Sequence, residues 1–240
     1  MAEGTADDGT ADDGTAVDWR REWPHWLMIA GMFALAAFAW TRVPERVPVH
    51  WDVEGNPDRF GGRAEGLLLI PCLTAGLYAL LLLLPRIDPG QANYRSFRGA
   101  YGWIRFALTA FLAGLFAVTT AETMGVPVAG ARLAMPLTGV LLVVIGNQIG
   151  RVRPNWFVGA RTPWTLSSKR SWDKSNRLCG RVLVVGGGLF IAAGVIGGRV
   201  APWLAIGFTA LGSLAVVPYS YLVYREDPDR VPPAGVSPAE

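Results

Sequence analysis

Residues 66–85 read GLLLIPCLTAGLYALLLLLP, and this stretch decides the fold because it runs for its whole length without a charged residue. A transmembrane α-helix needs about 20 mostly apolar residues. Five other stretches meet this test, so the predicted spans are 24–41, 66–85, 103–124, 133–149, 182–198 and 202–224. Strands of a membrane barrel would alternate apolar and polar residues. These stretches do not alternate, so the sequence predicts six transmembrane helices, whose backbone polar groups are paired within each segment.

The overall composition agrees with a chain that lies largely in lipid. Of 240 residues, 51% are hydrophobic and 17% are charged, whereas about a quarter of the residues in soluble domains are charged. No collagen, coiled-coil or solenoid period recurs. Cys72 and Cys179 are predicted to be free thiols, because a bond between them would join different membrane depths. We therefore expect an all-α, polytopic integral membrane protein and exclude a soluble enzyme.

The distribution of basic residues predicts the orientation of the spans. Cytoplasmic loops are enriched in Lys and Arg, and sixteen of the 22 basic residues fall on one side if the N-terminus is cytoplasmic. Both termini are therefore predicted to lie in the cytoplasm.

The chain then divides into a disordered acidic tail (1–23), two helices with an extracellular loop 42–65 (24–85), a linker with the third helix (86–132), a segment with a cytoplasmic loop 150–181 (133–224) and a disordered tail (225–240). The acidic tail is interpreted as a solvated leader, with an interaction arm as the alternative.

The extracellular loop carries the pattern of a short hairpin. Val47, Val49 and Trp51 would face one side of a strand, and the sequence Gly55-Asn-Pro-Asp58 is a strong turn signal. Trp51 and Phe60 are expected at the membrane interface. One imidazole with scattered carboxylates does not make a metal-ligand set. The favoured hypothesis is that His50 and Asp58 hydrogen-bond the loop into shape, and pH sensing through His50 is the alternative.

The cytoplasmic loop, residues 151–181, reads RVRPNWFVGARTPWTLSSKRSWDKSNRLCGR and holds eight basic residues and one acid. Such density beside a membrane favours attraction to anionic headgroups. Ser167 or Ser168 is expected to cap a helix that leads into the fifth span, and Trp172 and Cys179 are expected on a helix face at the membrane interface. The same helix would carry one basic face, made of Arg170, Lys174, Arg177 and Arg181. The polar and aromatic residues around Arg161 indicate a compact turn, and both a structural clasp and a binding surface remain open.

Both loops resemble known families. The stretch Asn155-Trp-Phe-Val-Gly-Ala-Arg-Thr-Pro-Trp-Thr-Leu-Ser-Ser168, followed by Trp172, Arg177 and Gly180, resembles the signature of the Sdp-type immunity proteins, the SdpI family. The outer segment Pro48-Val-His-Trp51 with Gly55, Pro57, Asp58 and Gly61 resembles the domain of unknown function that often precedes it. There are departures from the pattern, because Ser175 and Asn176 stand where Thr and His are expected, and Arg63 stands where Lys is common.

The resemblance assigns candidate residues to two motifs, none of them catalytic. The cytoplasmic motif, a candidate for binding or signalling, comprises Asn155, Gly159, Arg161, Thr162, Pro163, Trp164, Thr165, Ser167, Ser168, Trp172 and Arg177. The extracellular motif comprises Pro48, His50, Trp51, Gly55, Pro57, Asp58 and Gly61.

The resemblance implies a multi-pass cell-membrane protein that protects its producer from an exported killing peptide. It also implies, more weakly, a relay to a cytoplasmic transcriptional repressor. The expected partners are thus the lipid bilayer, the peptide and the repressor, with no cofactor, no metal and no nucleic acid.

A small transporter or channel is the alternative function. Transporters usually carry ionisable groups near the membrane midplane, and the predicted spans offer few: Asn147 and Gln148 near one end, Glu122 near the other. An enzyme is disfavoured, because hydrolase and metalloprotease motifs are missing from the sequence. The triplet Gly186-Gly-Gly188 lies inside a span and is expected to allow close helix packing.

Overall fold

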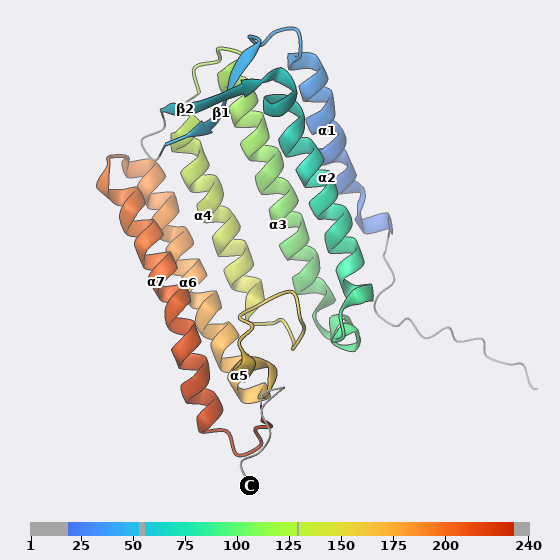
Figure 1. Cartoon of the computed structure of the whole chain (residues 1–240), viewed down its shortest axis with the longest axis vertical. Helices are drawn as coiled ribbons and strands as arrows, with labels where there is room; N and C mark the ends of the chain where they lie inside the picture. The colour runs from blue at the N-terminus through green and yellow to red at the C-terminus, as the bar shows by residue number, and fades with distance from the viewer. Residues whose placement is uncertain (1–18, 53–55, 129, 233–240) are drawn as a thin grey trace, which may run out of the picture.

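The computed structural model describes residues 19–52, 56–128 and 130–232, which form a bundle of long helices with a hairpin at one end (Figure 1). The elements in chain order are the 3₁₀ turn Trp19–Arg21, α1 (Trp23–Ala39), β1 (Arg46–Trp51), β2 (Pro57–Gly62), α2 (Arg63–Ile87), α3 (Gln91–Thr123), α4 (Gly130–Ile149), α5 (Pro163–Leu166), α6 (Lys169–Ile196) and α7 (Val200–Arg225). We call the two ends of the bundle the hairpin end and the loop end, the latter carrying residues 150–168.

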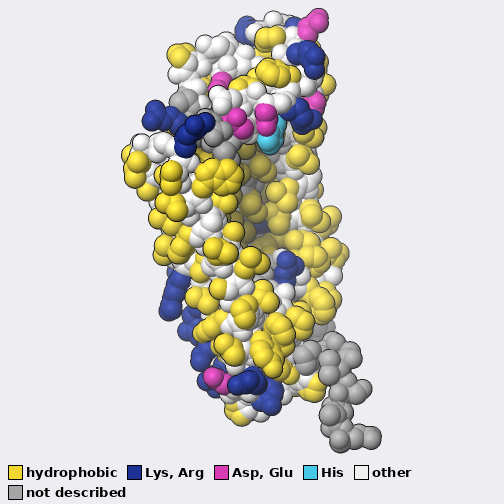
Figure 2. Space-filling view, turned by 60° about the vertical axis from the view of Figure 1, so that its left-hand side comes forward, with side chains coloured by type: hydrophobic (Ala, Val, Ile, Leu, Met, Phe, Trp, Pro, Cys, Tyr) yellow, Lys and Arg dark blue, Asp and Glu magenta, His cyan; other side chains and the backbone are white. Residues whose placement is uncertain are grey.

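Each of the six predicted spans coincides with a helix in the described part of the chain. Five of these helices, α2, α3, α4, α6 and α7, are long and apolar enough to cross a membrane. The remaining helix, α1, is apolar but has only 17 residues. In Figure 2, hydrophobic side chains cover the middle of the molecule, and charged side chains gather mainly towards its ends. The prediction of a helical, multi-pass membrane protein is therefore confirmed.

The predicted link at residues 86–102 is wrong, because most of it is helical. Helix α2 continues to Ile87 and α3 begins at Gln91, although the α3 backbone departs from helical geometry at Phe97. The first turns of α3 are amphipathic: Tyr94, Phe97 and Tyr101 are buried while the residues between them are largely polar. A search for uninterrupted apolar stretches misses such a segment, because only one face of the helix is apolar.

The helices form two groups of three. Helices α1, α2 and α3 pack together, as do α4, α6 and α7, and contacts between α3 and α4 join the groups. Glycines bring α4 and α6 into backbone contact at two levels. A Cβ atom on Gly180 would lie 2.5 Å from the carbonyl oxygen of Gly146, and one on Gly187 would lie 2.5 Å from that of Gly139. The predicted close packing at the glycine triplet is thus confirmed for Gly187, as it is for Gly186, where a Cβ would collide with Thr209 of α7.

Substituting Gly180 with alanine is expected to destabilise the protein by about 1 to 3 kcal/mol, because the new methyl group forces α6 away from α4. The matched control is Gly188→Ala in the same helix, where a Cβ would meet nothing within 4 Å. That substitution should leave stability unchanged or raise it, since alanine is the better helix former. Thermal unfolding of the purified protein in detergent compares the two variants, and equal stabilities would contradict the backbone contact.

The hairpin is fixed to the ends of the first three helices. Strands β1 and β2 are antiparallel, and Val47 is buried in a cluster with Leu67 of α2 and Phe116 of α3. Gly66 makes room for this contact, because a Cβ there would collide with the Val47 side chain. The predicted hairpin is therefore confirmed, with its valine face turned towards the helices.

Candidate functional site

At the hairpin end, His50 and Asp58 join the two strands. Nδ1 of His50 lies 2.6 Å from Oδ1 of Asp58, and both side chains are exposed. The predicted hydrogen bond between His50 and Asp58 is therefore present, and its role in shaping the loop stays a prediction. The backbone N–H of Asn56 donates to Asp52 Oδ1 at 2.8 Å and helps to close the turn, while Gly55 lies outside the described residues.

Close contacts at Gly61 and Arg63 hold the hairpin at the start of α2. Pro48 is half-buried, Pro57 begins β2, and Gly61 is buried at a point where a Cβ would collide with the Glu65 carboxylate. Arg63 donates to the carbonyl oxygens of Val43 and Pro44, each at 3.1 Å. The chain before β1 and the end of β2 are therefore both held at the start of α2.

Two aromatic side chains of the hairpin, Phe60 and Trp51, contribute to the surface at the hairpin end. Phe60 is 49% exposed, and Trp51 is half-buried with its indole Nε1 lacking a hydrogen-bond partner. Figure 2 shows that one face of the molecule is hollowed directly below the hairpin, with hydrophobic side chains around the hollow. The hairpin end thus offers aromatic surface beside an apolar hollow, while the Trp51 Nε1 itself is buried.

At the loop end, Asn155 organises the motif. Its side chain is buried, and its Oδ1 accepts from the backbone N–H groups of Phe157 and Val158 at 2.9 and 2.6 Å. Its Nδ2 donates to the carbonyl oxygens of Arg153 and Val158. One amide therefore makes four hydrogen bonds and fixes a tight turn.

Gly159 and Asn176 close the second part of the loop. Gly159 has a φ of +116°, a conformation that favours glycine, and a Cβ there would lie 2.6 Å from Asn176 Oδ1. That oxygen accepts from the N–H of Ala160 at 2.8 Å. Asn176, which departs from the family pattern, is fully buried and serves as a loop anchor.

Two threonines and a proline build the short helix α5. Thr162 and Thr165 form a reciprocal capping box, with Pro163 in the first turn. The Thr162 hydroxyl lies 2.9 Å from that of Ser220 in α7. The Trp164 ring packs against Tyr221 with 5.2 Å between ring centroids. The motif is thereby attached to the last helix.

The predicted cap of α6 is Ser168. Its hydroxyl oxygen accepts from the N–H of Ser171 at 2.9 Å, and its hydroxyl donates to Asp227 at 2.5 Å. This second bond lowers the pKa of the Asp227 carboxyl against the opposing effect of burial. The carbonyl of Ser167 accepts from the N–H of Val231. Residues 226–232, predicted as part of a disordered tail, are therefore held against the motif, while residues 233–240 lie outside the described chain.

The prediction that Trp172 lies at the membrane interface is wrong. Trp172 is fully buried, packs in a cluster with Tyr94, Tyr101 and Ile149, and donates from Nε1 to the carbonyl of Val152 at 2.7 Å. Cys179 packs against the same cluster. The helix periodicity correctly placed both residues on one face, but that face turns towards α3 and α4 instead of lipid.

Arg161 and Arg177 are exposed members of the motif. Arg161 Nη1 donates to the carbonyl of Trp156 at 2.6 Å, and Arg177 Nε donates to that of Asp173 at 3.0 Å. The compact turn predicted around Arg161 is centred on Asn155, and Arg161 lies on its surface. Beside it, Trp156 is 54% exposed. A clasp and an accessible surface therefore coexist in one motif.

Asp88 contacts the loop-end motif, a position that the sequence analysis missed. In the turn between α2 and α3, its carboxylate accepts from the N–H groups of Gly90 and Trp156 and from the hydroxyl of Tyr94 at 2.8 Å. It therefore ties the loop-end motif to the first group of helices. The available signal was the sequence Asp-Pro-Gly at 88–90, which predicts a turn but not its distant partner.

A buried ionic cluster at the start of α1 was also missed. Glu22 Oε1 lies 2.6 Å from Arg105 Nη2, and its Oε2 accepts from the Tyr78 hydroxyl at 2.9 Å. His25 stacks on Tyr78, and its Nδ1 lies 3.4 Å from Glu22 Oε2 without meeting hydrogen-bond geometry. Glu22 appeared to belong to the acidic tail, yet it is buried against the middle of the first helix group.

The fold and its two polar ends define a multi-pass cell-membrane protein with one motif at each end of the bundle. Residues 151–222 match the SdpI/YfhL protein family, and residues 27–75 match a domain of unknown function, DUF1648. The resemblance inferred from the two motifs is therefore confirmed, and each matched segment contains one of them.

Two curated proteins resemble the chain. The immunity protein SdpI of Bacillus subtilis (strain 168) is 22% identical over 206 residues, which cover 83% of this chain and 94% of that protein. An uncharacterized protein of Archaeoglobus fulgidus is 33% identical over 61 residues, which cover 25% of this chain and 33% of that protein. No solved structure matches the chain.

Proposed function

We propose that this protein is a membrane immunity protein that protects its cell from an exported antimicrobial peptide. The observation that carries the proposal is the similarity to the Bacillus subtilis immunity protein along 94% of that protein's length. The matched region includes both motif loops, so the likeness extends beyond a shared apolar composition. The chain has no assigned catalytic residue, and the proposed activity is binding.

The proposed topology has six membrane-crossing helices with both termini in the cytoplasm. Helix α1 would be the shortest of them, and its buried Glu22–Arg105 pair would neutralise the charge at its start. The hairpin would then lie outside the cell and the loop end inside it. The excess of basic residues at the loop end supports this orientation.

The hairpin end is the proposed contact for the peptide. An amphipathic or apolar peptide would meet the exposed ring of Phe60, the half-buried ring of Trp51 and the apolar hollow below the hairpin. Aromatic side chains supply large contact area and often dominate binding. A peptide held there would be kept from forming a lesion in the membrane.

The loop end is the proposed output surface. The hydrogen bonds of Asn155 and Asp88 fix the backbone, so Arg161 and Trp156 are presented on a rigid support. If peptide binding shifts one helix group against the other, this surface changes its position. A cytoplasmic transcriptional repressor is the proposed receiver of that change.

The test is survival and membrane potential of sensitive cells that express the full chain and are challenged with peptide-containing medium from the native producer. Cells with the protein should keep their potential, and Phe60→Ser should lose that protection. The matched control is Val126→Ser, a 45% exposed residue in the turn at the same end. Arg161→Ala should abolish signalling to the repressor at unchanged protein level. If expressing cells depolarise like empty cells, direct immunity is refuted.

One observation favours the alternative of a small transporter or channel. The Glu22–Arg105 pair and His25, whose Nδ1 lies 3.4 Å from Glu22 Oε2, place ionisable groups among the apolar parts of three helices, where such groups usually serve a purpose. Ion or proton flux into liposomes that contain the purified protein, lost in Glu22→Gln, would support transport. Protection of cells without any flux would support immunity alone.

A further inference from the structure

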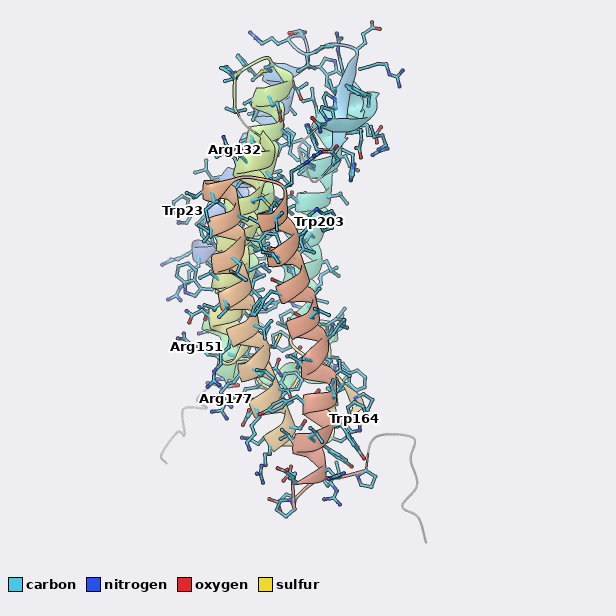
Figure 3. All side chains as sticks on the ribbon, turned by 90° about the vertical axis from the view of Figure 1, so that its left-hand side faces the viewer. Trp23, Arg132, Arg151, Trp164, Arg177 and Trp203 are labelled. Atoms are coloured by element: carbon cyan, nitrogen blue, oxygen red, sulfur yellow. The ribbon has the colours of Figure 1, made fainter. Side chains whose placement is uncertain are left out.

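The close crossing of α4 and α6 brings basic residues of α6 beside the chain that directly follows α4, at the loop end. A Cβ on Gly150 would lie 3.2 Å from Cγ of Arg177, so the aliphatic stem of Arg177 lies against the chain directly after α4. Arg151 is the next residue, and Arg181 follows Arg177 by one turn of α6. Figure 3 shows Arg151 and Arg177 on the same edge of the molecule. We call Arg151, Arg177 and Arg181 the arginine site.

The arginine site has positive charge that the protein does not neutralise. Asp173, the nearest acid along α6, pairs with Lys169 at 3.0 Å and with Arg153 at 3.5 Å. Arg177 and Arg151 donate only to uncharged oxygens, a backbone carbonyl and the side chain of Gln148. Among the described residues, no carboxylate forms a salt bridge with any arginine of the site. An anion from outside the chain is therefore the complementary ligand.

The surface next to the arginine site is apolar and exposed. Val185 follows Arg181 by one helical turn and is 51% exposed, and Leu189 follows by two turns and is 37% exposed. Residues at this spacing lie on one helix face. Arg181 also directly precedes the apolar stretch of α6, so the arginines lie where that stretch ends. The same face thus offers cations first and a strip of aliphatic surface beyond them.

We propose that the arginine site binds the phosphate headgroup of an anionic phospholipid, with the acyl chains lying along Val185 and Leu189. Guanidinium groups bind phosphate oxygens in a bidentate manner. Basic sites between transmembrane helices at the interface bind anionic headgroups. A soluble phosphate would use only the arginines, whereas a phospholipid uses the whole face. Bound lipid also bridges α6 and the chain after α4, and its negative charge reduces the mutual repulsion of the three arginines.

The experiment compares the full-length protein in nanodiscs of phosphatidylcholine alone and with added phosphatidylglycerol. Native mass spectrometry counts the phosphatidylglycerol molecules that stay bound, and unfolding midpoints report stabilisation by the lipid. The site variant is Arg151→Gln/Arg177→Gln/Arg181→Gln. The control variant removes the same charge from scattered exposed positions, Arg86→Gln/Arg95→Gln/Arg225→Gln. A third arm adds soluble glycerol phosphate to protein in phosphatidylcholine.

The site variant should bind phosphatidylglycerol about a hundredfold more weakly, since each of the three basic residues near the surface contributes about fivefold to binding. It should lose the stabilisation by phosphatidylglycerol while unfolding normally in phosphatidylcholine. The control variant should retain both properties. An equal loss in the two variants would overturn the proposal in favour of general surface attraction. If glycerol phosphate raises the unfolding midpoint as much as phosphatidylglycerol does, the site binds a soluble anion and the lipid proposal is overturned. If phosphatidylglycerol changes neither binding nor the unfolding midpoint, the proposal is refuted.

Discussion

Replacing Arg105 with leucine is expected to destabilise the protein by about 3 to 5 kcal/mol, because removal of one partner leaves a buried charge uncompensated. The Glu22 side chain is 4% exposed, and its carboxylate lies 2.6 Å from Arg105 Nη2. Tyr78 supplies one neutral hydrogen bond to the same carboxylate, which cannot replace the lost cation. Thermal unfolding in detergent, followed through tryptophan fluorescence, measures the effect.

The matched control is Arg95→Leu, which removes the same charge from an exposed position on the same helix. It should change stability by less than about 0.5 kcal/mol. The double variant Glu22→Gln/Arg105→Leu should recover much of the loss, because a pair removed together leaves no unpaired charge. If Arg105→Leu unfolds like Arg95→Leu, the cluster does not join the first three helices.

The elements that the sequence predicts well depend on local patterns. The apolar stretch at 66–85 is sufficient for α2, because helix formation in lipid follows from hydrophobic length alone. The alternation around Val47 and the turn before Asp58 are sufficient for the hairpin. The cap at Ser168 follows from one hydroxyl side chain placed before a helix. In each case the residues that determine the element lie within the element.

The residues that the sequence analysis missed have partners far along the chain. Glu22 meets Arg105, which lies 83 residues away, and Asp88 meets Trp156, which lies 68 residues away. Neither acid stands in a motif, and their positions in a tail and a turn are those of ordinary solvated residues. Both acids are buried because particular helices pack against each other, and the local sequence around each acid does not specify that packing.

Trp172 illustrates the same limit on the prediction of the candidate site. Its periodicity correctly gives the helix face, but periodicity contains no information about whether lipid or protein covers that face. The close approach of α4, permitted by the Gly146–Gly180 contact, puts the chain around Val152 beside the Trp172 indole. The exposed arginines on the other face then become the accessible part of the motif.

Substituting Asn155 with alanine is expected to cost about 2 kcal/mol of stability, because it leaves the partly buried N–H groups of Phe157 and Val158 without their acceptor. The loop should lose its fixed shape before the helices unfold. Amide hydrogen exchange at residues 155–160 should therefore accelerate strongly, with little change in α2 and α3. Signalling to the repressor should be lost as it is in Arg161→Ala, because Arg161 is bonded to the carbonyl of Trp156 in the same turn.

The control for this loop is Asn147→Ala, which removes the same amide from an exposed position near the end of α4. It should leave both stability and exchange at residues 155–160 unchanged. The comparison separates the two interpretations of the motif. If the motif only stabilises the fold, Asn155→Ala should lower the stability of the protein and its protection against the peptide together. If Asn155→Ala weakens signalling while peptide protection persists, the turn serves the output surface. If the exchange pattern is unaltered, Asn155 does not hold the loop.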